Sequence, residues 1–184
     1  MPLANTKDRY GTITKIFHWL IVILFANQYI VANIMIPLEP GESFLGLTEG
    51  PLYQWHKSIG ILIFFVAVLR FTWRKTTRLP SWAAGLSDWE KGFIHWYERL
   101  LYAAMFIMPL SGYIFVEAGG YGLPGLPRWL PRNELLSVAG EIVHIITGYA
   151  IVVAITCHLA LVVKRQTFDS DGYIRRMLLG TSQN

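Results

Sequence analysis

The sequence contains little charge and hardly any cysteine. Charged residues account for 15% of its 184 residues, compared with roughly 25% in typical soluble domains. Cys157 is the single cysteine, which excludes a disulfide bond within the chain. The polar start, residues 1–9, lacks a signal-peptide cleavage pattern, so we expect the first apolar segment to remain in the mature protein. The connection at residues 74–91 has no room for a catalytic domain, and the glycine-rich segment 119–132 does not resemble a phosphate-binding loop.

Apolar residues make up 53% of the chain and aromatic residues 14%, a composition typical of membrane proteins. A membrane-spanning helix needs about 20 predominantly apolar residues. We expect such helices over residues 14–36, 52–75, 90–117 and 138–166. The sequence therefore predicts a single domain, residues 1–184, of the all-α integral membrane class, folded as a four-helix transmembrane bundle.

Lysine and arginine residues are concentrated on one side of the expected membrane. They flank the start of the first helix, the connection between the second and third, and the end of the fourth: Lys7, Arg9, Lys15, Arg70, Arg74, Lys75, Arg78, Lys91, Arg99, Lys164, Arg165, Arg175 and Arg176. The opposite side has Lys57, Arg128 and Arg132. The positive-inside rule therefore predicts a multi-pass protein with both termini cytoplasmic. This topology explains the pI near 9.3 without a nucleic-acid partner, and a basic surface also attracts anionic membrane lipid.

The fourth apolar segment contains two histidines, His144 and His158. At 1.5 Å and 100° per residue, they lie about 21 Å apart along the helix axis and within about 40° of one face. Ionisable side chains inside a membrane segment are costly, so we expect both to face the bundle interior and to serve a function there. One helix thus offers imidazoles at two depths, as two stacked metal centres would require.

Two further histidines lie at matching depths on other helices. His56 lies near the external end of the second helix, like His144, and His18 lies near the cytoplasmic end of the first, like His158. We therefore expect one pair in an outer layer and one pair in an inner layer. An interface anchor is the alternative interpretation of His18. His95 is left over on the cytoplasmic side, where it could compete with His18 for the inner site.

Paired neutral imidazoles suit the two axial positions of a haem iron, and helix bundles commonly hold such cofactors in their cores. Zinc is disfavoured because it would need three or four ligands per site, and no Asp, Glu or Cys lies at matching depth. A covalently attached haem is disfavoured because Ala154 stands where a Cys-x-x-Cys-His motif would have its first cysteine. The sequence therefore predicts a bundle that encloses two non-covalent b haems. The expected iron ligands are His18, His56, His144 and His158.

Three more residues are candidates for contact with the cofactors. Gly60 lies one turn after His56, and Gly148 one turn after His144, so a missing side chain at each position would let a flat macrocycle approach the backbone. Small residues also permit close helix packing in membranes, but the repeated pattern favours the macrocycle. Arg70 lies at the depth of the inner layer, where a cation could pair with a haem propionate. A positive-inside flank is the alternative interpretation of Arg70.

The two external connections differ in composition. Residues 37–51 contain Glu39, Glu42 and Glu49 together with proline and glycine, and we expect an irregular acidic loop. Residues 119–132 are rich in glycine and proline, and we expect an irregular segment that covers the outer site or docks a partner.

A series of motifs follows the same order as these elements. They are His56-Lys-Ser-Ile-Gly60 with Arg70 and Arg74, His95 with Leu101-Tyr102, Met108-Pro109-Leu-Ser-Gly112, His144, His158 and the tail Asp171-Gly-Tyr-Ile-Arg-Arg-Met177. In their order and spacing over four helices, they resemble the bacterial cytochrome b561 family, from about Arg9 to Leu179. The resemblance implies that first-helix and second-helix histidines pair with two on the fourth helix, as depth also predicts.

The resemblance also implies a location in the bacterial inner membrane and an activity. The family's best-defined activity is superoxide oxidation on the outer side, with electrons delivered through both haems to ubiquinone. Members often carry a second histidine three residues after the one that matches His95, and Glu98 holds that position here. We interpret His95 and Glu98 as a candidate quinone site, in which His95 would donate a proton. The alternatives are that His95 ligates the inner iron or anchors its helix at the interface.

Three functions of different classes remain open. The first is an oxidoreductase that passes electrons from an external, periplasmic donor such as superoxide to membrane quinone. The second is an electron-transfer subunit that serves a docked dehydrogenase or a soluble cytochrome. The acidic external loop favours the second, because steering a small anion such as superoxide prefers a positive surface. The third, a haem-free structural membrane protein, would leave the inward-facing histidines unexplained.

Overall fold

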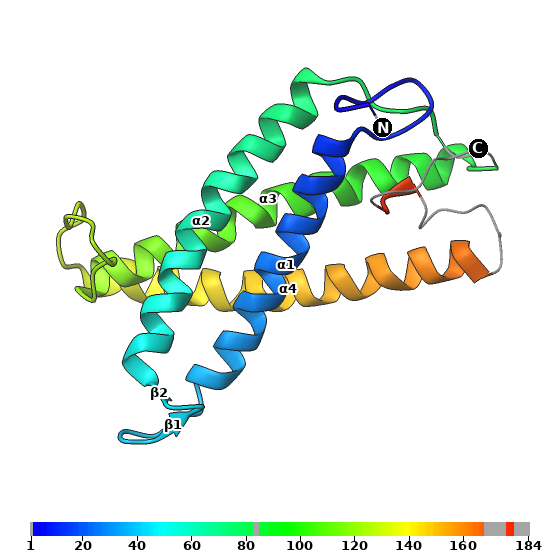
Figure 1. The fold of residues 1–184 in the computed structure, drawn as a ribbon. Helices are drawn as coiled ribbons and strands as arrows, with labels where there is room; N and C mark the ends of the chain where they lie inside the picture. Colours follow the sequence, from blue (N-terminus) through cyan, green and yellow to red (C-terminus); the bar gives the residue numbers. More distant parts are fainter. Residues whose placement is uncertain (1, 83–84, 168–175, 179–184) are drawn as a thin grey trace.

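The computed structural model describes residues 2–82, 85–167 and 176–178, which form four helices and one short hairpin (Figure 1). The helices are α1 (Thr12–Met35), α2 (Glu49–Thr76), α3 (Asp88–Gly119) and α4 (Glu134–Thr167). The strands β1 (Ser43–Phe44) and β2 (Leu47–Thr48) pair antiparallel between α1 and α2. Each of these helices is long and apolar enough to cross a membrane, which confirms the predicted all-α membrane class. Residues 171–175 of the tail motif lie outside the described residues.

The helices associate mainly as two pairs. α1 packs along α2, α3 packs along α4, and α2 also contacts α3. In Figure 1 the α1–α2 pair crosses in front of the α3–α4 pair. A core cluster joins α1, α2 and α3 and consists of Ile21, Leu24, Ile63, Val66, Ala67 and Met105. The two pairs are therefore held together mainly through α2 and α3.

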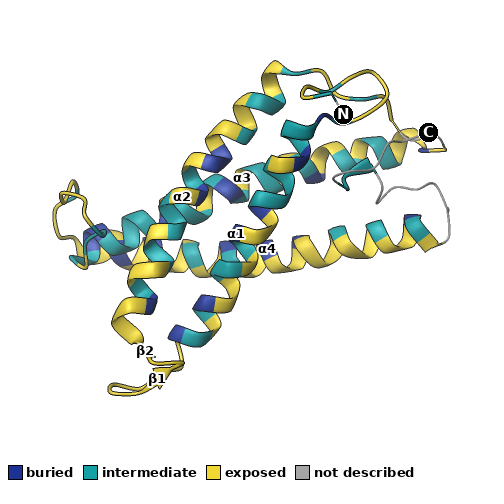
Figure 2. Cartoon of the chain, in the orientation of Figure 1, coloured by how far each residue is buried: buried dark blue, intermediate teal, exposed yellow. Residues whose placement is uncertain are grey.

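The outward faces of the helices are exposed and apolar. Figure 2 shows exposed residues along all four helices, and on α4 they include the large side chains of Ile146, Val153 and Leu159. Monomeric soluble proteins rarely expose contiguous apolar surface of this extent. In a bilayer these faces contact lipid, while the helical hydrogen bonds satisfy the backbone. The chain is thus an integral membrane protein.

The third and fourth helices have well-defined ends. Ser87 and Glu90 form a capping box at the start of α3, in which each side chain accepts a hydrogen bond from the other residue's backbone N–H. α3 ends at Gly119 and is capped by Gly120, whose φ of 85° is the left-handed conformation that glycine adopts without strain. At the start of α4, the Asn133 side chain accepts a hydrogen bond from the N–H of Leu136 at 3.0 Å. These caps fix where the connection between α3 and α4 begins and ends.

The first external connection differs from the irregular loop that we expected. It contains the β1–β2 hairpin, and α2 begins at Glu49 rather than near residue 52. The turn is closed by Leu45 and Gly46, which have positive φ values of 51° and 80°. Two consecutive residues with positive φ are typical of the tight turn that matches the twist of paired strands. Leucine is an uncommon residue in this conformation, so the sequence did not indicate the hairpin.

Both chain ends that the structure describes lie at one end of the bundle. Trp19 Nε1 of α1 donates to the carbonyl of Met177 at 2.8 Å, and Lys15 Nζ donates to the carbonyl of Leu178 at 2.7 Å. Arg176 donates to the carbonyl of Ser81, in the connection between α2 and α3, at 2.8 Å. We call this the inner end, and the end with the hairpin and residues 120–133 the outer end.

Candidate functional site

Residues of all four helices line a cavity of about 2140 Å³. Pockets for a single small ligand typically measure about 300–1,000 Å³, so this cavity has room for more than one large cofactor. The lining is mainly apolar. It includes all of the predicted ligands, His18, His56, His144 and His158.

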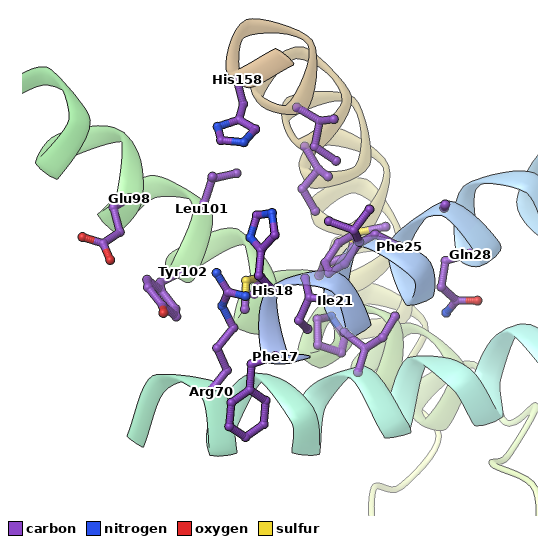
Figure 3. A pocket seen from close by; sticks show the side chains of 18 of the residues that line it. Phe17, His18, Ile21, Phe25, Gln28, Arg70, Glu98, Leu101, Tyr102 and His158 are labelled. Carbon is purple, nitrogen blue, oxygen red and sulfur yellow. The ribbon is translucent and has the colours of Figure 1, made fainter. Parts of the chain in front are cut away.

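At the inner end of the cavity, His18 of α1 faces His158 of α4. Their ring centroids lie 6.4 Å apart, with an angle of 57° between the ring planes. Figure 3 shows the two rings pointing into the same space from their separate helices. The structure therefore brings together the pair expected for the inner layer.

At the outer end, His56 of α2 faces His144 of α4. Their ring centroids lie 6.2 Å apart, with an angle of 78° between the ring planes. This is the pair expected for the outer layer. Both histidines of α4 thus face a partner from the α1–α2 pair, as the spacing of His144 and His158 on one helix face predicts.

The spacing of both pairs suits an iron ion between the rings. Metal–imidazole bonds are about 2.0–2.1 Å long and a ring centroid lies roughly 1.1 Å behind its nitrogen, so two imidazoles on opposite sides of one metal ion place their centroids roughly 6.2–6.4 Å apart. The observed distances of 6.2 and 6.4 Å fall within this range. Among the described residues, His, Cys, Asp and Glu side chains do not gather in groups of three or more that could hold a metal ion by themselves. The histidine pairs therefore fit a haem better than they fit a bare metal ion.

The two histidines of α4 are held by different parts of α3. His144 Nδ1 lies 2.9 Å from the carbonyl oxygen of Met108 and 3.4 Å from the hydroxyl of Ser111. The ring of His158 stacks on that of Tyr97, with centroids 6.3 Å apart and planes 5° apart. The Tyr97 hydroxyl donates to the carbonyl of Ala154, one turn before His158. α3 therefore sets the position of both imidazoles although it lacks a ring in either pair.

Arg70 of α2 extends toward the inner pair. Figure 3 shows its guanidinium close to His18, and it lies over the ring of Tyr102 at 5.8 Å from the centroid. Its Nε and Nη1 atoms are buried and have no hydrogen-bond partner among the described residues. Buried donors without a partner are costly, so this guanidinium fits an anionic group that enters the cavity, such as a haem propionate.

Gly60 and Gly148 both line the cavity. A Cβ atom at Gly60 would lie 3.4 Å from Gln28 Nε2, and one at Gly148 would lie 3.4 Å from Met108 Cε. These are contacts with the ends of flexible side chains, so close packing between helix backbones does not require glycine at either position. The space that the two glycines leave open faces the cavity.

His95 lies apart from the inner pair, in a cluster at the inner end. Its ring is half-exposed, contacts the Trp82 ring edge-on at a centroid distance of 5.0 Å, and lies 3.9 Å from Glu98. Glu98 forms a bidentate ion pair with Arg74 of α2, at 2.6 and 2.9 Å. This cluster also lines the cavity. It therefore joins a histidine, a carboxylate and a guanidinium at the edge of the same space.

The second external connection covers the outer end of the cavity. Leu123, Leu126 and Trp129 line the cavity, and the backbone N–H of Trp129 donates to the buried carboxylate of Glu117 at 3.0 Å. Lys57 of α2 donates to the carbonyl of Gly122 at 3.2 Å. We expected this segment to cover the outer site or to dock a partner. The contacts that the structure gives are those of a segment that covers the outer site.

The sequence did not indicate the roles of three residues that shape the site. Arg74 belongs to the positive flank of the expected inner side, and the structure pairs it with Glu98 of α3. Tyr97 and Gly112 approach residues of α4. No local pattern marks such a contact, because it depends on how two helices are rotated against each other.

A membrane bundle with two facing histidine pairs in one cavity defines the class of b-type membrane cytochromes. Residues 9–180 match the family described as prokaryotic cytochrome b561, so the chain belongs to this family. The predicted family is thereby confirmed. Members are haem b proteins that transfer electrons in membranes.

The chain is also similar to cytochrome b561 homolog 2 of Escherichia coli (strain K12). The two are 27% identical over 183 residues, which cover 97% of this chain and 95% of the relative. The likeness thus extends over all four helices and both external connections.

Proposed function

We propose that this protein is a di-haem b cytochrome that transfers electrons between a donor at the outer membrane face and membrane quinone. The observation that carries the proposal is the presence of two histidine pairs in one cavity, at centroid distances of 6.2 and 6.4 Å. His56 and His144 hold the outer haem, His18 and His158 hold the inner haem, and residues 1–184 form one cytochrome domain. When bound, the two irons supply the one-electron redox chemistry that the side chains lack.

Three further residues bind the cofactors in this proposal. Arg70 donates hydrogen bonds to a propionate of the inner haem, since its Nε and Nη1 atoms have no partner among the described residues. Gly60 and Gly148 let the macrocycles approach the helix backbones. The haems are held without a covalent bond in this proposal, because Ala154 stands where the Cys-x-x-Cys-His attachment motif would have its first cysteine.

The cluster of His95, Glu98 and Arg74 is the proposed quinone site. Reduction of one quinone to quinol takes up two electrons and two protons. If superoxide is the donor, two superoxide anions each lose one electron and leave as molecular oxygen. His95 delivers protons from the inner side because it is half-exposed and lies 3.9 Å from Glu98. The Arg74–Glu98 ion pair orients the carboxylate toward that exchange.

The proposed location is the bacterial inner membrane, with the inner end in the cytoplasm. The inner end carries most of the lysine and arginine residues. The described residues near the two chain ends lie together there. Quinone, membrane lipid and a periplasmic or membrane-bound redox protein are the expected partners.

The haem content of the purified protein tests this proposal. We expect two b haems per chain by pyridine haemochrome assay, low-spin spectra typical of two histidine ligands, and no carbon monoxide binding by the reduced protein, since both axial positions are filled. One haem per chain, or a high-spin site that binds carbon monoxide, would contradict the two-layer arrangement.

An electron-transfer subunit that serves a docked dehydrogenase or a soluble cytochrome is the second candidate function. The acidic residues Glu39, Glu42 and Glu49 at the outer end favour it, because they oppose the approach of a small anion. Stopped-flow mixing of the oxidised protein with superoxide separates the two candidates. Rapid haem reduction supports the oxidoreductase, whereas slow reduction together with copurification of a redox protein supports the subunit.

A further inference from the structure

The ring of His144 forms a hydrogen bond with the backbone of α3. Its Nδ1 atom lies 2.9 Å from the carbonyl oxygen of Met108. A carbonyl oxygen accepts hydrogen bonds and cannot donate them, so Nδ1 must carry the proton. The lone pair of Nε2 then remains free to bind an iron ion, and the His144 ring lies 6.2 Å from the His56 ring, centroid to centroid. The contact thus selects the tautomer that an iron ligand needs.

Gly112 provides the space in which this ring lies. A Cβ atom at position 112 would lie 2.8 Å from Cε1 and 2.9 Å from Nδ1 of His144. Real Cβ atoms do not approach other heavy atoms so closely, so a side chain at position 112 would force a shift between α3 and the His144 ring and disturb the contact with Met108. The same addition at Gly92, also in α3, would meet no atom within 4 Å.

A hydroxyl group shares the same carbonyl. Ser111 Oγ donates to the Met108 carbonyl at 3.0 Å and lies 3.4 Å from His144 Nδ1. The carbonyl therefore divides its acceptor capacity between a hydroxyl and the imidazole. This sharing weakens the bond to His144 relative to a carbonyl that serves the imidazole by itself.

The facing ring lacks a comparable bond. His56 Nδ1 is buried and has no hydrogen-bond partner among the described residues. The two imidazoles of the outer pair are therefore inequivalent. A hydrogen bond from the far N–H of a ligating imidazole raises its basicity, so His144 is the stronger electron donor of the two.

We propose that Gly112 and the Met108 carbonyl form a seat that fixes the orientation of His144 and lowers the reduction potential of the outer haem. The seat consists of residues 108, 111 and 112 of α3, which act through His144 and do not themselves touch the iron. Stronger donation from an axial ligand stabilises the ferric iron, which is why the potential falls. This inference rests on the proposed function, because it requires His144 to be a haem ligand.

Gly112→Ala tests the seat, with Gly92→Ala as the matched control on the same helix. Both variants are purified as full-length, haem-loaded protein, and each is studied by redox titration and by electron paramagnetic resonance of the ferric state. The signal that His56→Ala removes identifies the outer haem. We expect Gly112→Ala to raise the outer potential and shift the outer signal, or to lose the outer haem, while the inner haem is unchanged. Gly92→Ala should leave both haems as in the wild type.

Ser111→Ala provides an independent test that introduces no clash. It frees the Met108 carbonyl for His144, so the outer potential should fall, the direction opposite to Gly112→Ala. This variant decides the question if Gly112→Ala does not fold. The seat is refuted if the outer potential and signal match the wild type in both variants, or if the inner haem shifts instead. A wild-type protein with fewer than two bis-histidyl haems would instead refute the proposed function.

Discussion

An iron with two axial imidazoles loses its low-spin state when either ring is removed, so each cavity histidine can be assigned to a layer by its replacement with alanine. His144→Ala should remove the outer haem and keep the inner one, and His158→Ala should do the reverse. The physical reason is that each ring faces a different partner, His56 and His18 respectively. Haemochrome assays should fall from two haems per chain to one in each variant.

This assignment requires that the variants remain folded in the membrane. Gly92→Ala, which adds a methyl group at an open position, serves as the control for expression and insertion. If either histidine variant were membrane-inserted and folded but lost both haems, the layers would depend on each other and the prediction would be wrong.

His95 has three candidate roles, which are iron ligand, proton donor and interface anchor, and its contacts decide which of them we expect. It contacts Trp82 and Glu98, whereas His18 faces His158. We therefore expect His95→Ala to keep both haem spectra but to slow electron exchange with ubiquinone by roughly 10²-fold or more, the usual scale for a lost proton donor. Stopped-flow reduction of the haems by ubiquinol measures this rate.

His18→Ala is the comparison for this experiment and should lose the inner haem. Loss of the inner haem in the His95 variant, with the haems of the His18 variant intact, would make His95 the ligand. Unchanged quinol kinetics together with intact haems would leave His95 an interface anchor.

Among the helices, α3 contacts both cavity histidines of α4 through side chains and carbonyls that differ at the two depths. At the inner depth, Tyr97 stacks on His158, and its hydroxyl donates a hydrogen bond to the Ala154 carbonyl. Tyr97→Phe keeps the stacked ring and loses a hydrogen bond, which contributes about 0.5–1.5 kcal/mol to stability. Tyr97→Leu loses the stacking as well. We therefore expect Tyr97→Leu to shift the paramagnetic resonance signal of the inner haem, and Tyr97→Phe to lower thermal stability with little change in that signal.

Trp96→Leu is a suitable control, since Trp96 is a neighbouring exposed aromatic residue on α3. It should leave both haem signals unchanged. If Tyr97→Leu also left the inner signal unchanged, the stacked ring would not orient His158.

At the scale of the whole molecule, the bundle encloses a cavity of about 2140 Å³ between helices that pack mainly in pairs. In the proposed di-haem protein, cofactors that fill this space would link α4 to α1 and α2 through the histidine pairs. A ligand present at 1,000 times its dissociation constant stabilises the folded state by about 4.1 kcal/mol. We therefore expect the haem-free protein to unfold at a clearly lower temperature than the haem-loaded protein, as measured by circular dichroism in the same detergent.

The single-haem variants His144→Ala and His158→Ala should unfold at intermediate temperatures. Equal unfolding temperatures for the haem-free and haem-loaded wild type would show that the protein alone holds the two helix pairs together.

The sequence by itself determined the helices and the depth of each histidine. A bilayer core demands about 20 apolar residues per span and excludes unsatisfied backbone groups, so apolar length is enough to predict each helix. Depth follows from position along a helix of known rise, which is why His56 could be matched to His144 and His18 to His158. The order of the motifs along the chain predicted the family, and residues 9–180 match that family.

The tertiary structure decided which groups meet across helices. Membrane helices are apolar on nearly every side, so hydrophobic periodicity does not show how each one is rotated toward its neighbours. For this reason the sequence indicated neither the bond from His144 to the Met108 carbonyl nor the ion pair between Arg74 and Glu98. The β1–β2 hairpin depends on a positive φ at Leu45, a conformation that leucine seldom adopts. The two interhelix contacts, in contrast to this local hairpin, arise from the packing of segments far apart in the chain, which no local pattern encodes.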